Sequence, residues 1–304
     1  MSRKRYGRRS CTEMRENMEQ HFNTPAEVID TNMKAGEGKA HLPMGKMILL
    51  GIMAGAFIAL GGATSSTAAH AIDNVGLARF VAGIIFPVGL MIIVFVGGEL
   101  FTGNCLIVMD VVGKKVTWFE CIRNLIVVYF SNLMGALIID TLIYFSGNLD
   151  YTGGLLGAYA IKVAVGKVGI SPLRGITSGI LCNILVCIAI LMAVAATDIV
   201  GKVWAIFFPI MAFVVGGFEH CVANMFYIPV GMMAAQNPVY VAKAQEAYGL
   251  TAEQIRGLTV LHSLNNFIPV TIGNILGGMV FVGIPCYFIY KKKWQKWHED
   301  AKTA

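Results

Sequence analysis

Long apolar runs, separated by short polar segments, fill most of the chain past residue 44. Six of these runs approach the length of helix, roughly 20 residues, that crosses about 30 Å of hydrocarbon. We place them at about residues 47–70, 80–96, 122–145, 173–196, 203–216 and 268–290. The pattern therefore predicts an all-α membrane protein with six transmembrane helices, in which residues 44–292 form the membrane domain.

The second and fifth runs are each interrupted by glycines and polar residues, at residues 97–104 and 216–224. Irregular backbone is tolerated inside a membrane only where protein or an aqueous cavity satisfies its polar groups. We therefore expect transmembrane helices 2 and 5 to be broken. The residues that we assign to the breaks are Gly98, Gly103, Asn104, Gly217 and Asn224.

The second three runs repeat features of the first three. The segment Gly175–Gly179 resembles Gly51–Gly55, and residues 273–277 (GNILG) stand where residues 131–135 (SNLMG) stand in the first half. Because each repeat has three spans, the second enters the membrane from the opposite side. In such inverted repeats the interrupted helices meet near the midplane and form the substrate site.

Composition and charge support this topology. The chain is 56% hydrophobic and 14% charged, with a mean hydropathy of +0.65, which excludes a soluble globular domain. Of its 24 Lys and Arg residues, 18 lie on one side if both termini are cytoplasmic. The net charge of +6 is thus a topology signal rather than a sign of nucleic-acid binding. The outer six are Arg79, Lys162, Lys167, Arg174, Lys243 and Arg256.

The two ends of the chain are polar and basic. Residues 1–43 have no apolar core and no small-residue cleavage site, so they do not resemble a signal peptide. We interpret residues 1–43 and 293–304 as cytoplasmic tails of a multi-pass protein of the inner (plasma) membrane. Residues 239–262 form an additional loop in the second half, and residues 146–171 form a glycine-rich connection.

Enzymatic chemistry has little support in the sequence. The seven cysteines lie mostly inside apolar runs without CxxC spacing, which predicts neither disulfides nor a zinc site. The sequence has no HExxH, Walker or GxSxG motif. We therefore expect a protein that is not an enzyme and has no metal or cofactor.

The most unusual chemistry is the ionisable pair Glu219-His220 in apolar sequence. An ionisable residue inside a membrane is a functional hypothesis by default. His220 either lines a pore or joins helices through a backbone carbonyl, and its place in a helix break favours the pore. Glu219 either orients His220 or caps a helix end. Thr102, in the other break, offers a hydroxyl to a solute or to a local turn.

Other polar residues allow either a structural or a functional interpretation. Asn104, Asn183 and Asn224 are at membrane depth, where an asparagine links helices at least as often as it contacts a solute. Lys167, taken alone, is typical of a solvated surface lysine. The remaining candidates would be ordinary packing residues on sequence alone.

Three separated segments resemble the formate/nitrite transporter family: residues 217–229 (GFEHCVANMFYIP), 100–104 (LFTGN) and 268–275 (IPVTIGNI). The resemblance covers about residues 25–292. It implies an aquaporin-like protomer, a homopentamer with one pore in each protomer, and transport of a small monovalent anion such as formate, nitrite, hydrosulfide or lactate. Formate fits these motifs best.

The resemblance also implies roles for particular residues. His220 matches the central histidine of the family, Thr102 the threonine that faces it, Asn183 a pore asparagine and Lys167 a vestibule lysine. The positions that match the hydrophobic constrictions are Phe86, Leu90, Leu100, Phe101, Val186 and Phe213. The chain departs from the family pattern at Pro172, at Arg174 and in the long 239–262 loop.

These residues suggest a mechanism. We hypothesise that a positive vestibule concentrates the anion, that a proton is transferred near His220 or from water, and that the neutral acid crosses the constriction. A channel for uncharged solutes would be an alternative, but the two Asn-Pro-Ala boxes of aquaporins are absent. A membrane scaffold without transport is a further alternative, which a flux measurement would distinguish.

Overall fold

The computed structural model describes residues 22–291, which form helices joined by short connections. Six of the helical segments are long and apolar enough to span a membrane, as the apolar runs predict. They cover Met44–Ala69, Val75–Val96, Trp118–Phe145, Pro172–Ala195, Ile199–Gly216 and Val260–Tyr290. The chain is therefore a multi-pass membrane protein.

The first half of the described chain contains one peripheral helix, three spans and a short re-entering segment. Its helices are α2 (Pro25–Ala40), α3 (Met44–Ala69), α4 (Val75–Ile85), α5 (Val88–Val96), α6 (Phe101–Asn104), the 3₁₀ turn η1 (Cys105–Ile107), α7 (Val108–Val112) and α8 (Trp118–Phe145). The second span consists of α4 and α5, which meet at Pro87. It ends at Gly97, and α6 to α7 continue after the break.

The second half repeats this order with additions. Its helices are η2 (Asn148–Asp150), α9 (Tyr151–Val168), α10 (Pro172–Ala195), α11 (Ile199–Gly216), α12 (Cys221–Ala234), α13 (Pro238–Tyr248), α14 (Ala252–Arg256), α15 (Val260–Ile275), the π-helical η3 (Leu276–Gly283) and α16 (Ile284–Tyr290). The fifth span, α11, ends at Gly216, and α12 begins after the second break. Both predicted breaks are therefore present.

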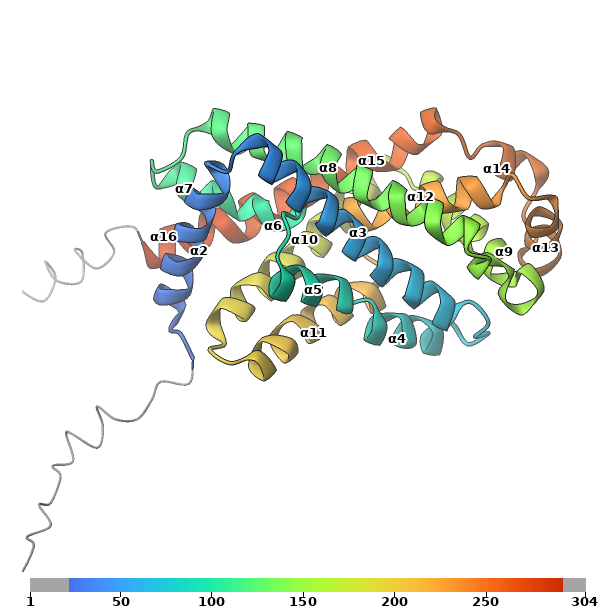
Figure 1. The fold of residues 1–304 in the computed structure, drawn as a ribbon, viewed down its shortest axis with the longest axis horizontal. Helices are drawn as coiled ribbons and strands as arrows, with labels where there is room; N and C mark the ends of the chain where they lie inside the picture. Colours follow the sequence, from blue (N-terminus) through green and yellow to red (C-terminus); the bar gives the residue numbers. More distant parts are fainter. Residues whose placement is uncertain (1–21, 292–304) are drawn as a thin grey trace, which may run out of the picture.

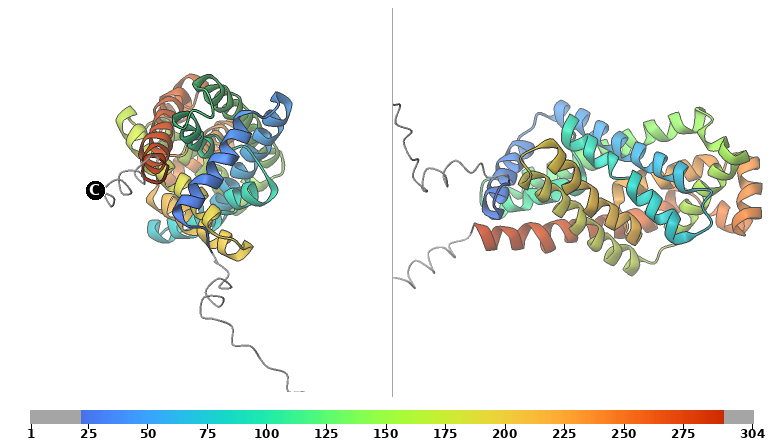
Figure 2. Two further views of the ribbon diagram at one scale, coloured as in Figure 1. Left: turned by 90° about the vertical axis from the view of Figure 1, so that its left-hand side faces the viewer. Right: turned by 90° about the horizontal axis from the view of Figure 1, so that it is seen from below.

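The long helices run between two ends of the molecule, as Figures 1 and 2 show. One end carries α2, α7 and α16, and the other carries α9, α13 and α14. Both described chain ends, residues 22 and 291, lie at the first of these ends. An even number of spans requires this arrangement.

Glycines bring α3 against α8, and α10 against α15 and the following η3. A Cβ on Gly135 would lie 1.9 Å from the carbonyl oxygen of Ile52, and one on Gly277 would lie 2.4 Å from that of Ile180. Small residues allow such close backbone contact between membrane helices. The contacts make Ile180, not Ile176, the counterpart of Ile52. The structural register of the repeat in α10 is thus one helical turn later than the glycine spacing suggests.

Helix α2 lies within the expected N-terminal tail of residues 1–43. Thr24 and Glu27 form a capping box at its start, and the buried side chains of Ile29 and Met33 belong to an apolar cluster with residues of η1, α7, α10 and η3. Residues 25–40 therefore belong to the packed domain, because this face of α2 is apolar. Residues 1–21 and 292–304, in the expected tails, lie outside the described residues.

The segments that the sequence presents as connections are largely helical. Most of the 146–171 connection is α9, which becomes regular after three left-handed residues, Thr152–Gly154. The 239–262 loop contains α13, α14 and the first turn of α15. The ring of Tyr240 lies on Gly157, and its hydroxyl donates a 2.5 Å hydrogen bond to Asp150. These contacts attach α13 to α9 and fix one wall of the cavity described below.

Candidate functional site

Two asparagines hold the broken helices in place. The side chain of Asn132, on α8, accepts a hydrogen bond from the amide of Phe101 and donates to the carbonyls of Gly51 and Glu99. Asn274, on α15, makes the same three bonds, with Cys221, Gly179 and Glu219 as partners. Each asparagine thus satisfies backbone groups that the break leaves without helical partners, as membrane depth requires.

A left-handed glycine ends the first half of each broken helix. Gly97 has φ = +102° and Gly217 has φ = +69°, a region that glycine enters without steric cost. Gly98, which we assigned to the first break, follows Gly97 in the non-helical segment and packs closely on Ala54 of α3. Gly103, also assigned to the break, lies against Ile190 of α10.

Each break also carries a buried cluster of lysine, glutamate and asparagine. In the second break, Lys167 donates to both oxygens of Glu219 at 3.0 and 3.1 Å. The amide nitrogens of Asn224 and Asn266 also donate to this carboxylate, at 2.7 and 3.1 Å. The carboxylate of Glu219 is thus paired with Lys167 and hydrogen-bonded to two asparagines. Within residues 22–291 it forms no hydrogen bond to the side chain of His220, so it does not orient the imidazole directly.

The first break has a matching cluster. Lys39 pairs with Glu99 at 3.3 Å and donates to Asn104 at 2.9 Å, and Asn104 donates to Glu99 and to Asn124. Asn104 and Asn224 therefore act as helix links. Lys39, Asn124 and Asn266 belong to these clusters but were not among the residues predicted from the sequence. The shared spacing Glu-x₄-Asn, in residues 99–104 and 219–224, was the signal that could have identified the two glutamates as equivalent.

The two predicted pore groups meet across the breaks. The hydroxyl oxygen of Thr102 lies 3.0 Å from Nε2 of His220, and both residues are buried. The other ring nitrogen, Nδ1, accepts a 3.0 Å hydrogen bond from the amide of Ala223 and thus carries no proton. In a neutral imidazole the proton is then on Nε2, so His220 donates to Thr102. The hydroxyl hydrogen of Thr102 remains free to turn toward another acceptor.

Asn183 links the two halves of the site. Its amide nitrogen donates to the carbonyl of Thr102 at 3.2 Å and to that of Asn274 at 2.6 Å. Cys187, one turn later on α10, lies 3.6 Å from the same carbonyl of Thr102. Both amide hydrogens of Asn183 are thus used by backbone carbonyls, which favours the linking role over the solute contact.

The six expected constriction residues are all buried, but they are not all at the same place. Phe86 and Phe213 meet edge to face with ring centroids 5.5 Å apart, and Phe213 also stacks on His220 at 5.7 Å. Phe101 instead packs on Tyr129 of α8 and is a core residue. Leu90, Leu100, Phe101 and Val186 all belong to the same large apolar cluster as Phe86 and Phe213.

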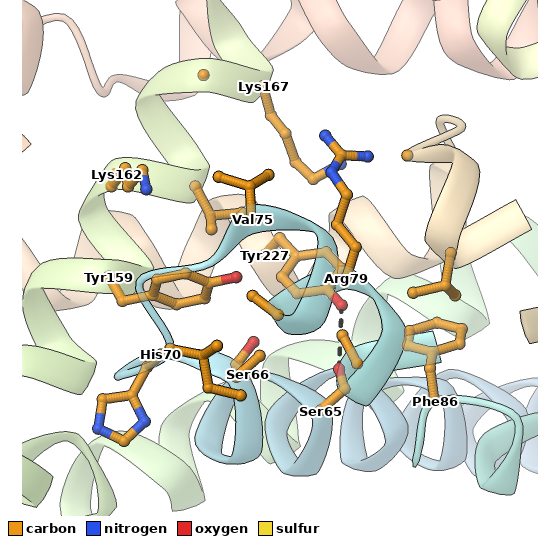
Figure 3. Close-up of a pocket in the computed structure, with 18 of the residues that line it drawn as sticks. Ser65, Ser66, His70, Val75, Arg79, Phe86, Tyr159, Lys162, Lys167 and Tyr227 are labelled. Carbon is orange, nitrogen blue, oxygen red and sulfur yellow. Dashed lines mark hydrogen bonds between the residues drawn. The ribbon is translucent and has the colours of Figure 1, made fainter. Parts of the chain in front are cut away.

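A cavity of about 620 Å³ opens on one side of this constriction, and we call it the vestibule. His220, Phe86 and Phe213 form its inner end, and Lys167 and Glu219 line it. It lies at the end of the molecule that carries α9 and α13, opposite α2. Figure 3 shows Lys167, from α9, and Arg79, from α4, extending into it. Lys167 thus lines the cavity, and its role in a vestibule for the anion stays a prediction of the family resemblance.

Comparisons with known proteins agree with this geometry. The model of a family described as formate/nitrite transporter matches residues 26–288. A probable formate transporter of Methanothermobacter thermautotrophicus is 36% identical over 90% of this chain and 98% of its own. The formate channel FocA of Escherichia coli (strain K12) is 35% identical over 88% of this chain and 95% of its own.

Solved structures show the same fold. A pentameric formate channel with formate bound superposes with a TM-score of 0.74 and 35% identity, covering 82% of this chain and 98% of that one. An ion channel described as a member of the FNT family gives a TM-score of 0.72 at 25% identity, covering 86% of this chain and 98% of that one.

Proposed function

The chain belongs to the formate/nitrite transporter family, whose members are channels and transporters rather than enzymes; from this premise we propose that it moves formate across the membrane together with a proton. The observation that carries the proposal is the contact between His220 and Thr102 at the inner end of the vestibule. Relatives described as formate channels favour formate as the anion.

The apolar surroundings of this contact favour passage of the neutral acid. Phe86 and Phe213 border His220, and removing a carboxylate from water in such surroundings costs several kcal/mol at least. For an acid with a pKa near 4, protonation at pH 7 costs about three pKa units, or roughly 4 kcal/mol. Protonation is therefore the less costly way through the constriction.

The hydrogen bonds of His220 limit its part in this step. Since Nδ1 is held by the amide of Ala223, the neutral ring has one proton, on Nε2, and losing it would leave a highly unfavourable imidazolate. We propose that water in the vestibule supplies the proton. His220 and Thr102 then act as hydrogen-bond donors that replace the water around the passing oxygen atoms.

The assembly and orientation are part of the proposal. The pentameric formate channel among the solved structures supports a homopentamer, and the large apolar side chains exposed on the protomer suit contact with lipid and neighbouring copies. The distribution of Lys and Arg along the sequence, 18 in the segments assigned to one side and six in those assigned to the other, supports cytoplasmic termini in the inner (plasma) membrane. The vestibule then faces outward.

Flux into proteoliposomes tests the proposal. We expect formate entry to acidify the lumen, as a pH dye reports, and formate to enter faster than nitrite, hydrosulfide or lactate. His220→Phe should reduce formate flux at least about tenfold, since loss of one hydrogen-bond donor to a charged or reacting group is worth more than 1.4 kcal/mol. Unchanged flux with unchanged pH dependence in His220→Phe would refute the mechanism. Absence of anion flux would instead favour a neutral-solute channel or a scaffold.

A further inference from the structure

The vestibule is far larger than the anion that we expect to cross it. Its volume of about 620 Å³ lies within the range of roughly 300–1,000 Å³ that is typical of sites for small organic ligands. A formate ion fills only a small part of such a space and would keep its water there. The size of the cavity is therefore not explained by formate passage alone.

Two cations in the vestibule have no acidic partner among residues 22–291. Arg79 donates one hydrogen bond, to the carbonyl of Val215 at 3.3 Å, and its other N–H groups are free of protein acceptors. The ammonium of Lys162 lies over the ring of Tyr248, 4.4 Å from its centroid. By contrast, Lys167 is paired with Glu219. The positive charge of the vestibule that has no ion-pair partner within residues 22–291 thus lies on Arg79 and Lys162, outside the constriction. Asp73 lies in the same lining and forms no ion pair with either cation.

Aromatic rings line the space between these cations. Tyr159, Tyr227 and Tyr248 all contribute to the wall. Figure 3 shows the ring of Tyr227 next to Arg79 and that of Tyr159 on the side of Lys162. Tyr248 comes from α13, so the additional segment of the second half completes this wall. Tyrosine rings offer apolar faces at little entropic cost and are favoured at binding sites.

The inner end of the vestibule closes against a bulky ligand. Phe86 and Phe213 meet edge to face there, and Phe213 stacks on His220. A ligand with an aromatic ring that entered the vestibule would stop at these rings. It would then occupy the route to the contact between His220 and Thr102.

We propose that the vestibule is a binding site for aromatic monocarboxylates, whose carboxylate pairs with Arg79 while the ring packs on the tyrosines, and that a bound ligand blocks the pore. The planar guanidinium of Arg79 suits a carboxylate because it can donate two parallel hydrogen bonds. The blocking part rests on the proposed formate transport, whereas the binding part stands without it.

Binding of benzoate to the purified full-length protein tests the site directly. Ligand-observed NMR in detergent should show saturable binding to the unaltered protein, and Arg79→Gln should weaken it about tenfold, the effect of one charge-assisted hydrogen bond. The affinity of Arg79→Lys for benzoate should lie between those of the unaltered protein and Arg79→Gln. Lysine keeps the positive charge but cannot donate two parallel hydrogen bonds to a carboxylate. Arg256→Gln, which removes an exposed arginine that does not line the vestibule, should bind benzoate normally.

The tyrosine wall has its own test. Tyr248→Phe keeps the ring and should retain benzoate binding, whereas Tyr248→Leu should weaken it several-fold. Equal binding by Arg79→Gln and the unaltered protein, with Arg79→Gln folded by its melting temperature, would overturn the site. So would benzoate binding that does not saturate.

Formate flux then tests the block. Benzoate added outside proteoliposomes should slow the initial formate flux of the unaltered protein at least about fivefold, and Arg79→Gln should need about tenfold more benzoate for the same effect. Saturable binding without any slowing of flux would overturn the block. If no variant transports formate, the proposed function fails, but the NMR result still decides whether the site exists.

Discussion

The two helix breaks have the same scaffold and different pore groups. In each, an asparagine of a neighbouring helix makes three bonds to the broken backbone, and a lysine pairs with a glutamate just before the half-helix. At the next position, however, the first break has Leu100 and the second has His220. The shared asparagine and lysine–glutamate pair therefore stabilise both breaks. The residue after the glutamate differs, so only the second break has an imidazole at this position.

The two lysine clusters also differ in their exposure. The side chain of Lys39 is 34% exposed and bridges Glu99 and Asn104, whereas that of Lys167 is 16% exposed and uses Glu219 alone. The side-chain oxygen of Asn224 consequently has no hydrogen-bond partner, although Asn224 borders the vestibule. The lysine of the second break is thus the more buried of the two, although Glu219 is slightly more exposed than Glu99, at 10% against 6%. The second break is also the one that adjoins the cavity.

The largest expected effect tests whether the scaffolds are equivalent. Asn132→Leu and Asn274→Leu each leave one amide and two carbonyls without a partner, at about 1–3 kcal/mol for each buried group. We expect both variants to lose at least about 3 kcal/mol of stability and most of the assembled protein in size-exclusion chromatography. Gln236→Leu, at a surface amide, is the control. If one of the two asparagine variants assembled normally, the breaks would not be equivalent.

The next test uses the difference between the lysine clusters. Glu219→Gln leaves the buried ammonium of Lys167 without its partner, and we expect a loss of about 3 kcal/mol in stability. Glu99→Gln should cost about 1 kcal/mol, because Lys39 can reach water. Thermal unfolding in detergent measures both. The double variant Glu219→Gln/Lys167→Met should regain stability, because it removes the unpaired ammonium. A larger loss of stability in Glu99→Gln than in Glu219→Gln would contradict the prediction that Lys167 depends more on its partner than Lys39 does.

A smaller effect concerns the pore groups. Thr102→Val has the same shape but removes the acceptor of the His220 Nε2–H, so formate flux in proteoliposomes should fall about tenfold with assembly unchanged. Thr102→Ser keeps the hydroxyl and should retain most of the flux. Normal flux in Thr102→Val would make the first break a scaffold only.

The smallest expected effect concerns the hydrogen bond that anchors the backbone amide of the glutamate in each helix break. The amide of Glu219 donates to the hydroxyl of Ser178, whereas the amide of Glu99 donates to the backbone carbonyl of Leu50. Ser178→Ala should therefore lower stability by about 1 kcal/mol, seen as a shift of a few degrees in melting temperature. No side-chain substitution at Leu50 can remove the equivalent bond, so Leu50→Ala should leave this anchor intact. A Ser178→Ala variant as stable as the unaltered protein would show that water replaces the hydroxyl.

Local sequence patterns predicted the spans and the breaks because both are local properties. Apolar length defines a span, and a cluster such as Gly97-Gly98 is enough to interrupt one. The Glu219-His220 pair was visible for the same reason. The contact between His220 and Thr102 was expected only through the family resemblance, since the two residues are 118 positions apart.

The features that were missed depend on distant partners or on weak patterns. Lys39 and Asn124 join Glu99 and Asn104 from two other helices, and no spacing along the chain identifies them. Helix α9 was not predicted because its glycines are typical of a loop, although its second half is rich in alanine and valine. The one-turn difference in the repeat register arises because α10 has two glycines one turn apart, Gly175 and Gly179, and only the contacts with α15 and η3 select between them.

The hydrogen bond between His220 and Thr102 has a consequence for energy conservation in the cell. At 3.0 Å, their atoms leave no room for a water molecule between them. A continuous file of water would let protons hop along it and dissipate the membrane potential. In the transport that we propose, the two side chains that would solvate a passing acid bind each other in its absence, which would interrupt such a file of water at this contact.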